Sequence, residues 1–91
     1  MVYAILYKIT KTEKDYTPLY ERIKSLGEWM HYFNDSWLLV SSKNISTSEV
    51  YDQIIPFIDG SDDLLLVIRV TNDYRGWLPQ KAWNWMKDKT F

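Results

Sequence analysis

Runs of apolar residues alternate along the chain with segments of helical spacing, and their order predicts the fold. Residues 2–9 are apolar except for Lys8, which predicts a central strand buried on both faces. Residues 15–26 carry apolar side chains three or four positions apart and are followed by Gly27, a residue typical of the position just after a helix. A first strand and a first helix are therefore expected at the N-terminus.

Residues 28–42 predict a β-hairpin closed by a two-residue turn. Asn34 and Asp35 form that turn because both side chains tolerate positive φ angles. Phe33 then pairs with Ser36, and directly opposed residues share a face. One face carries Trp29, His31, Phe33, Leu38 and Val40, and the other carries Met30, Tyr32, Trp37 and Leu39. The two tryptophans are expected on opposite sides of the sheet, where they cannot form one stacking platform.

Three further segments complete the pattern. Ser46 and Glu49 form a capping box ahead of apolar residues at helical spacing, so a second helix is expected that ends near Pro56. Residues 64–70 form an almost continuous apolar run that predicts a fourth strand. Residues 76–91 again place apolar side chains at helical spacing and predict a short third helix packed on the domain.

The order strand, helix, strand, strand, helix, strand predicts one α+β domain over residues 1–91. With right-handed crossovers this is the ferredoxin-like βαββαβ arrangement, an antiparallel four-stranded sheet in the order 4-1-3-2 with both helices on one face. The uncovered face is also apolar, which predicts a partner surface, and a symmetric homodimer is the simplest partner. The candidate interface residues are Tyr3, Tyr7, Met30, Tyr32, Trp37 and Leu39.

Composition narrows the class of protein. The 91 residues are 46% hydrophobic and 16% aromatic, so some rings are expected to find cover at an interface. A net charge of −1 argues against a strong nonspecific DNA binder. The absence of cysteine excludes disulfides, thiolate metal sites and thiol nucleophiles. The N-terminal apolar run has no basic flank and is too short to span a bilayer, so a cytoplasmic protein without membrane contact is expected.

Three loops are expected to meet at one end of the sheet and to carry any chemistry. A site for a nucleotide or another anion would use Lys8, Lys11, Lys14, Tyr16, Asn34 and Asp35. Alternatively, Asp62 and Asp63 would hold Mg²⁺ or Mn²⁺ through their carboxylate oxygens, or would pair with the nearby lysines. His31, the only histidine, is interpreted as a hydrogen-bonded core or interface residue rather than a catalyst.

The motifs SLGEWMHYFNDSWLLVSS and DDLLLVIRVT resemble a group of small bacterial and phage proteins. Further points of similarity are Tyr3, Tyr7 and Ile9, then Tyr16, Leu19 and Ile23, and finally Gly76-Trp77-Leu78. The group is often labelled SinR-like and is related to the VapD toxins and to the small endonuclease-type subunit of CRISPR spacer acquisition. The resemblance implies a ferredoxin-like domain that dimerises, often through its sheets.

The same resemblance implies a difference in chemistry. In the nuclease-type relatives the first strand ends in a tyrosine-aspartate pair, and the aspartate holds the catalytic metal. Lys8 occupies the matching position and places a positive charge where the cation would sit.

The leading hypothesis is a non-catalytic, cofactor-free homodimeric binding protein. Its ligand would be a nucleotide, a nucleic acid or a component of a defence or toxin system. A divergent metal-dependent nuclease is the alternative, and a pure protein–protein assembly module or inhibitor is a third possibility. Phosphate recognition weakens as salt rises whereas apolar docking does not, so salt dependence separates the first hypothesis from the third.

Overall fold

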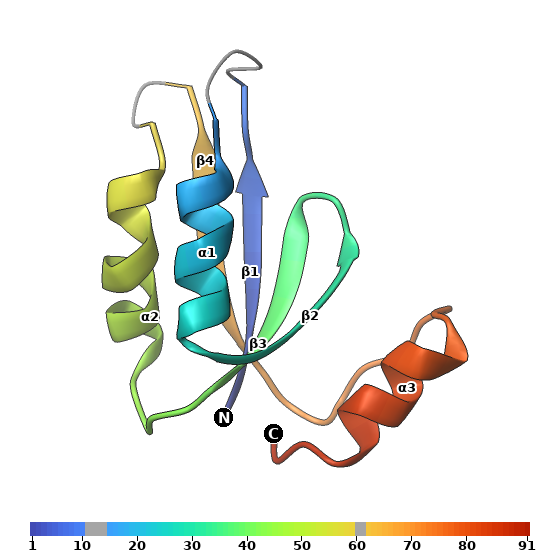
Figure 1. Ribbon diagram of the computed structural model, residues 1–91. Helices are drawn as coiled ribbons and strands as arrows, with labels where there is room; N and C mark the ends of the chain where they lie inside the picture. The colour runs from blue at the N-terminus through green and yellow to red at the C-terminus, as the bar shows by residue number, and fades with distance from the viewer. Residues whose placement is uncertain (11–14, 60–61) are drawn as a thin grey trace.

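The computed structural model describes residues 1–10, 15–59 and 62–91 (Figure 1). The described elements are β1 (Val2–Lys8), α1 (Thr17–Ser25), β2 (Gly27–Phe33), β3 (Ser36–Ser41), α2 (Thr47–Ile54), β4 (Leu64–Val70) and α3 (Gln80–Lys87). A short 3-10 helix (η1, Ile55–Phe57) extends α2. The predicted order of elements is confirmed, and β4 has the predicted bounds. None of the described helices is long and apolar enough to cross a membrane.

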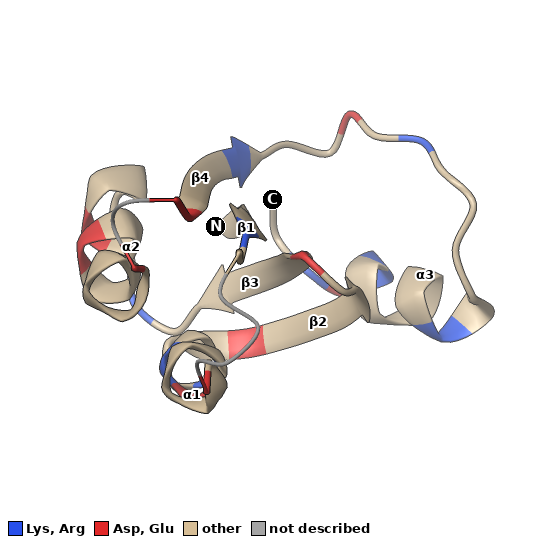
Figure 2. Ribbon diagram, turned by 90° about the horizontal axis from the view of Figure 1, so that it is seen from above, with Lys and Arg blue, Asp and Glu red and all other residues tan. Residues whose placement is uncertain are grey.

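The strands form one antiparallel sheet in the order β2-β3-β1-β4, which is the predicted order counted from the other edge. Helices α1 and α2 cover one face, called here the inner face (Figures 1 and 2). Helix α3 lies on the opposite side of the sheet next to β2, and an irregular segment leads to it from the end of β4. The opposite face, called here the outer face, is covered by α3 only near β2.

The inner face holds the main core because alternate residues of the strands point beneath the helices. Tyr3, Ile5 and Leu39 are at most 1% exposed and belong to one cluster with Ile23 of α1 and Ile54 of α2. Burying a side chain of this size stabilises the fold by roughly 1.5–3 kcal/mol relative to leaving it exposed.

The start of α2 is fixed by its predicted capping box, which is confirmed. The Ser46 hydroxyl accepts a hydrogen bond from the backbone N–H of Glu49, whose carboxylate accepts one from the backbone N–H of Ser46. Two otherwise unpaired donors at the helix start are satisfied in this way.

Gly27 links α1 directly to β2 at a point of close backbone contact. Its φ angle is 156°, and a Cβ atom at this position would lie 2.0 Å from the carbonyl oxygen of Val40. Only glycine fits without a shift of the neighbouring strand. The predicted position of Gly27 just after α1 is confirmed, and the close approach to β3 supplies the physical reason.

The hairpin contains a β-bulge that the sequence pattern did not predict. Phe33 pairs with Ser36 across the turn as expected, but Met30 pairs with Leu38 rather than Leu39. Strand β2 therefore has one extra residue between Met30 and Phe33, and the rest of the hairpin is moved by one position. The predicted separation of the two tryptophans is wrong, since the rings of Trp29 and Trp37 lie on the same side with centroids 5.4 Å apart.

The structure also reverses the predicted choice of the uncovered face. Tyr3, Tyr7, Trp37 and Leu39 lie in the core beneath the helices, and Met30 is buried against α3. Of the six candidate interface residues only Tyr32 is exposed, so this set cannot form a partner surface. Homodimerisation itself stays a prediction, and the face open to a partner is the outer face.

Candidate functional site

The three loops predicted to meet at one end of the sheet are in contact there. The backbone N–H of Tyr7 donates to the carbonyl of Asp35 at 3.0 Å, and that of Thr10 donates to the carboxylate of Asp63 at 2.9 Å. The end of β1 is thereby joined to the hairpin turn, and the segment after β1 is joined to the residue that precedes β4. Two of the predicted ligand residues, Lys11 and Lys14, lie outside the described residues.

Asp63 is a buried structural carboxylate rather than an open ligand. It accepts hydrogen bonds from the backbone N–H and hydroxyl of Thr10, from the Tyr16 hydroxyl at 2.7 Å and from the backbone N–H of Asp59. The bond from the Thr10 backbone, followed by that from Tyr16, holds the pKa of Asp63 well below its usual range. A cation would have to replace these protein donors.

The remaining predicted site residues do not converge on one ligand. Tyr16 was predicted to stack on a base, but it is only 6% exposed and uses its hydroxyl to bind Asp63. Lys8 is exposed at the end of β1, where it pairs with Leu64 of β4. Asp62 and Asp35 are exposed. Among the His, Asp and Glu side chains of the described ranges, no group of three or more could hold a metal ion.

Trp37 is the centre of an aromatic cluster on the inner side of the hairpin. Its indole N–H donates to the hydroxyl of Tyr7 at 2.8 Å, and burial raises the pKa of Tyr7 to about 12. The ring of His31 stacks on Trp37 with centroids 3.7 Å apart and planes 12° apart, while the ring of Tyr20 lies 6.0 Å away. His31 is exposed, so it forms the outer layer of this stack and is not a core residue.

A groove of about 280 Å³ lies beside β2, where the hairpin meets α3. Trp29, His31, Tyr32, Lys81 and Trp85 line it together with Met30. Aromatic faces next to an ammonium group are the components of a base-stacking site. Trp83, the other tryptophan of α3, lines a pocket on the outer face, and both tryptophans pack against the cluster of Met30, Ala82 and Met86.

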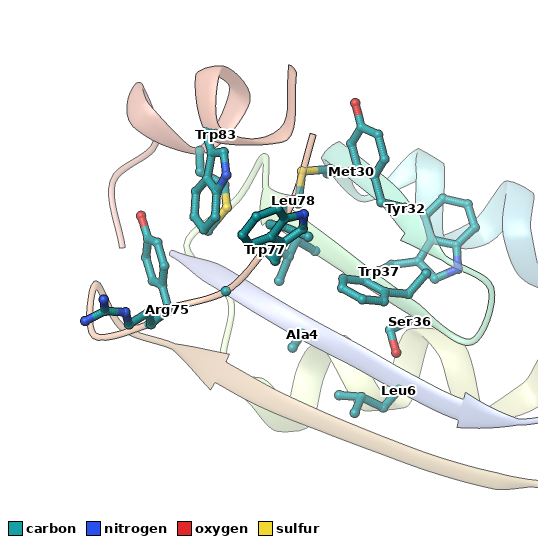
Figure 3. A pocket seen from close by; sticks show the side chains of 15 residues that line it. Ala4, Leu6, Met30, Tyr32, Ser36, Trp37, Arg75, Trp77, Leu78 and Trp83 are labelled. Carbon is teal, nitrogen blue, oxygen red and sulfur yellow. The ribbon is translucent and has the colours of Figure 1, made fainter. Parts of the chain in front are cut away.

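The outer face carries a row of exposed aliphatic side chains. Leu64, Leu66 and Ile68 of β4 are 62%, 55% and 44% exposed. Next to them a pocket of about 470 Å³ lies between the sheet, residues 74–78 and α3 (Figure 3). Trp77 lies at this pocket and is 98% exposed.

The sequence predicted an uncovered apolar face but assigned the wrong residues to it, and it did not predict the exposure of Trp77. The available signal was the tryptophan itself, placed between Gly76 and Leu78 in a segment outside the predicted sheet. An aromatic side chain in such a segment gains burial only from another part of the chain or from a partner.

No family model matches the chain, and comparisons with curated proteins and with solved structures found no match.

Proposed function

We propose that this protein is a non-catalytic binding protein that works as a homodimer through the outer face of its sheet. The observation that carries the proposal is the row of exposed aliphatic side chains on β4, formed by Leu64, Leu66 and Ile68. Contiguous apolar patches on small proteins mark interaction sites, because their burial is favourable in proportion to area. The order of elements supports a ferredoxin-like fold and, as part of the same proposal, a relationship to the SinR-like and VapD-like group.

The total accessible surface supports an unfilled interface. The chain of 10.9 kDa exposes 6232 Å², whereas a compact monomer of this mass is expected to expose about 5,600 Å². The chain therefore exposes more surface than a typical compact monomer of its mass, as expected for a protomer whose interface is not filled.

Two features favour binding over metal-dependent cleavage. Lys8 offers an ammonium group at the end of β1, and the oxygens of Asp63 accept hydrogen bonds from Thr10, Tyr16 and Asp59. A divergent nuclease would need inward-facing carboxylates with free oxygens to hold its metal. We therefore expect no Mg²⁺- or Mn²⁺-dependent cleavage of RNA or DNA.

A nucleotide or single-stranded nucleic acid is the ligand that the groove beside β2 favours. Trp29, Trp85 and Lys81 are among the residues that line it. Lys24 and Lys89 lie 5.0 and 4.9 Å from the centroids of these two rings. This ligand site replaces the one predicted at the loop end of the sheet.

Sedimentation velocity of wild type and of Leu66→Asp tests the homodimer. Wild type is expected to sediment as a dimer at tens of micromolar, and Leu66→Asp as a monomer, because a carboxylate would be buried without a partner in the interface. Gln53→Asp adds the same charge on α2, away from the outer face, and is expected to remain a dimer. A wild-type monomer up to about 1 mM would contradict the proposal.

Fluorescence anisotropy with a labelled oligonucleotide tests the groove. Trp85→Ala is expected to weaken binding by about 10-fold or more, since one stacked base contributes roughly 1–3 kcal/mol. Tyr51→Ala, which removes an exposed ring from α2, is the matched control. If the oligonucleotide does not bind wild type in low salt, or binds Trp85→Ala and Tyr51→Ala equally well, nucleotides and nucleic acids are ruled out as the ligand of this groove.

A further inference from the structure

We infer that Trp77 is the reciprocal anchor of the dimer, with the indole of each copy inserted into the outer-face pocket of the other copy. The inference rests on the proposed association through the outer face and names the residue and the cavity that meet there.

Trp77 is left almost uncovered by the described residues of its own chain. Its side chain is 98% exposed, although the neighbouring Leu78 is half-buried. A tryptophan buries 150–250 Å² when it is covered, and tryptophan is enriched among the residues that dominate interface energies. Leaving this ring in water forgoes a large part of the apolar burial available to a chain of this size.

The pocket has the size and the lining that an indole needs. Its volume of about 470 Å³ lies within the range of cavities that hold drug-sized molecules, so a two-ring side chain can enter it. Figure 3 shows Ala4 and Leu6 of β1 at its floor and Met30 and Trp83 on the side of α3, while the Arg75 side chain points away. Methionine sulfur and aromatic edges both make favourable contacts with an indole ring.

A second copy of this chain is the partner that fits both features. The exposed anchor and the pocket belong to the same surface, because Trp77 is one of the residues that line its own pocket and yet is 98% exposed. A two-fold dimer requires such a self-complementary patch, in which one residue contacts another and the reverse contact repeats across the axis. The exposed Leu66 and Ile68 of β4 continue the apolar surface beyond the pocket.

The test combines sedimentation with fluorine NMR of protein labelled with 5-fluorotryptophan. The chain has five tryptophans, and the resonance of Trp77 is identified as the one missing from Trp77→Phe. Over a dilution series we expect this resonance to shift in proportion to the dimer fraction. Trp77→Ala is expected to raise the dimer Kd by about 30-fold or more, the effect of losing one central hot-spot side chain.

Two controls separate the inference from the proposed function. Trp77→Ala should keep the wild-type melting temperature as a monomer, since its side chain is exposed, and Tyr51→Ala should keep the wild-type Kd. A dimer that is lost in Leu66→Asp but keeps its affinity in Trp77→Ala would overturn the anchor and leave the proposed function standing. A wild-type monomer with an unshifted Trp77 resonance would overturn both.

Discussion

The two faces of the sheet are built from similar residues but have different surroundings. On the inner face Ile5 and Leu39 are fully buried beneath the helices, while on the outer face Leu64 and Leu66 are more than half exposed. Both sets arise from the same alternation along the strands. Hydrophobicity alone therefore does not tell which face is covered, and the face that the helices leave open is the one available to a partner.

The polar groups of the inner face are also accounted for. Inner-face hydroxyls are paired, with Tyr3 donating to the carbonyl of Ile45 and Tyr7 to that of Asn34. Within the described residues no buried side-chain nitrogen or oxygen lacks a partner. Each such bond contributes about 1 kcal/mol when made and costs more when one partner is left alone, so the inner face is specified by geometry as well as by burial.

The largest expected effect comes from the same truncation made on each face. Leu39→Ala should lower the free energy of unfolding by about 3 kcal/mol, because it leaves a cavity in the core. Leu66→Ala should lower it by less than about 1 kcal/mol in the monomer, since Leu66 is 55% exposed. Urea unfolding at a concentration below the dimer Kd provides the measurement. An equal loss of unfolding free energy in Leu39→Ala and Leu66→Ala would contradict the assignment of one face as core and the other as open surface.

Asp63→Asn should cause the next largest loss in the free energy of unfolding. An amide cannot satisfy all the donors that converge on the Asp63 carboxylate. Its folded-state pKa lies below the ordinary value of 3.8, so the unfolded chain takes up the proton first as the pH falls. The stabilisation by Asp63 is complete above about pH 5 and is lost as the pH falls through the folded pKa.

Thermal melts of wild type and Asp63→Asn between pH 7 and pH 2 test this relation. The gap between the two melting temperatures should narrow as the pH falls. Asp62→Asn alters the exposed neighbouring carboxylate and should leave the wild-type pH profile unchanged. A gap that stays constant across this range would show that the hydrogen bonds do not depend on the charge of Asp63.

Tyr7→Phe should lower the free energy of unfolding by about 1–2 kcal/mol, because the indole N–H of Trp37 loses its acceptor. The pKa of Tyr7 is raised from 10.0 to about 12, so between these values the unfolded chain has lost a proton that the folded chain keeps. The free energy of unfolding of the wild type therefore falls as the pH rises through this window. The difference in free energy of unfolding between wild type and Tyr7→Phe should become smaller. Denaturant unfolding from pH 9 to pH 12 measures this, with Tyr51→Phe as the exposed control.

The smallest effect is expected at the edge of the aromatic cluster. His31→Ala should lower the free energy of unfolding by less than about 1 kcal/mol, because the imidazole is exposed and contributes one stacking contact with Trp37. Near-ultraviolet circular dichroism should nevertheless change, since the surroundings of the Trp37 indole are altered. A loss of 2 kcal/mol or more in the free energy of unfolding would show that the bulge in β2 depends on the stacking of His31 on Trp37.

Sequence periodicity predicted the elements and the sheet order, and its failures have identifiable causes. The hairpin turn was correct in position, but neither Asn34 nor Asp35 has the positive φ angle that was expected. No glycine or proline marks the bulge between Met30 and Phe33, so the register beyond it could not be foreseen. The covered face depends on where α1 and α2 dock, and both faces of β1 offer apolar residues. That choice is made by tertiary packing and has no local signal.

The candidate site shows the same limit. The meeting of three loops followed from the strand order, whereas the inward turn of Asp63 depends on donors from Thr10, Tyr16 and Asp59. The exposure of Trp77 depends on the course of the segment that leads to α3, which periodicity does not describe.

The central place of β1 has a consequence for how the chain folds. Its two neighbours in the sheet are β3 and β4, and the pairs Ile5↔Trp37 and Ile5↔Val67 join residues far apart in the sequence. The β2–β3 hairpin can close within microseconds from local contacts, but β1 must wait for distant partners, and such pairing slows folding. During synthesis β1 leaves the ribosome before the other strands of this sheet but is among the last to be enclosed, and its apolar residues depend on pairing with β4 once residue 70 has emerged.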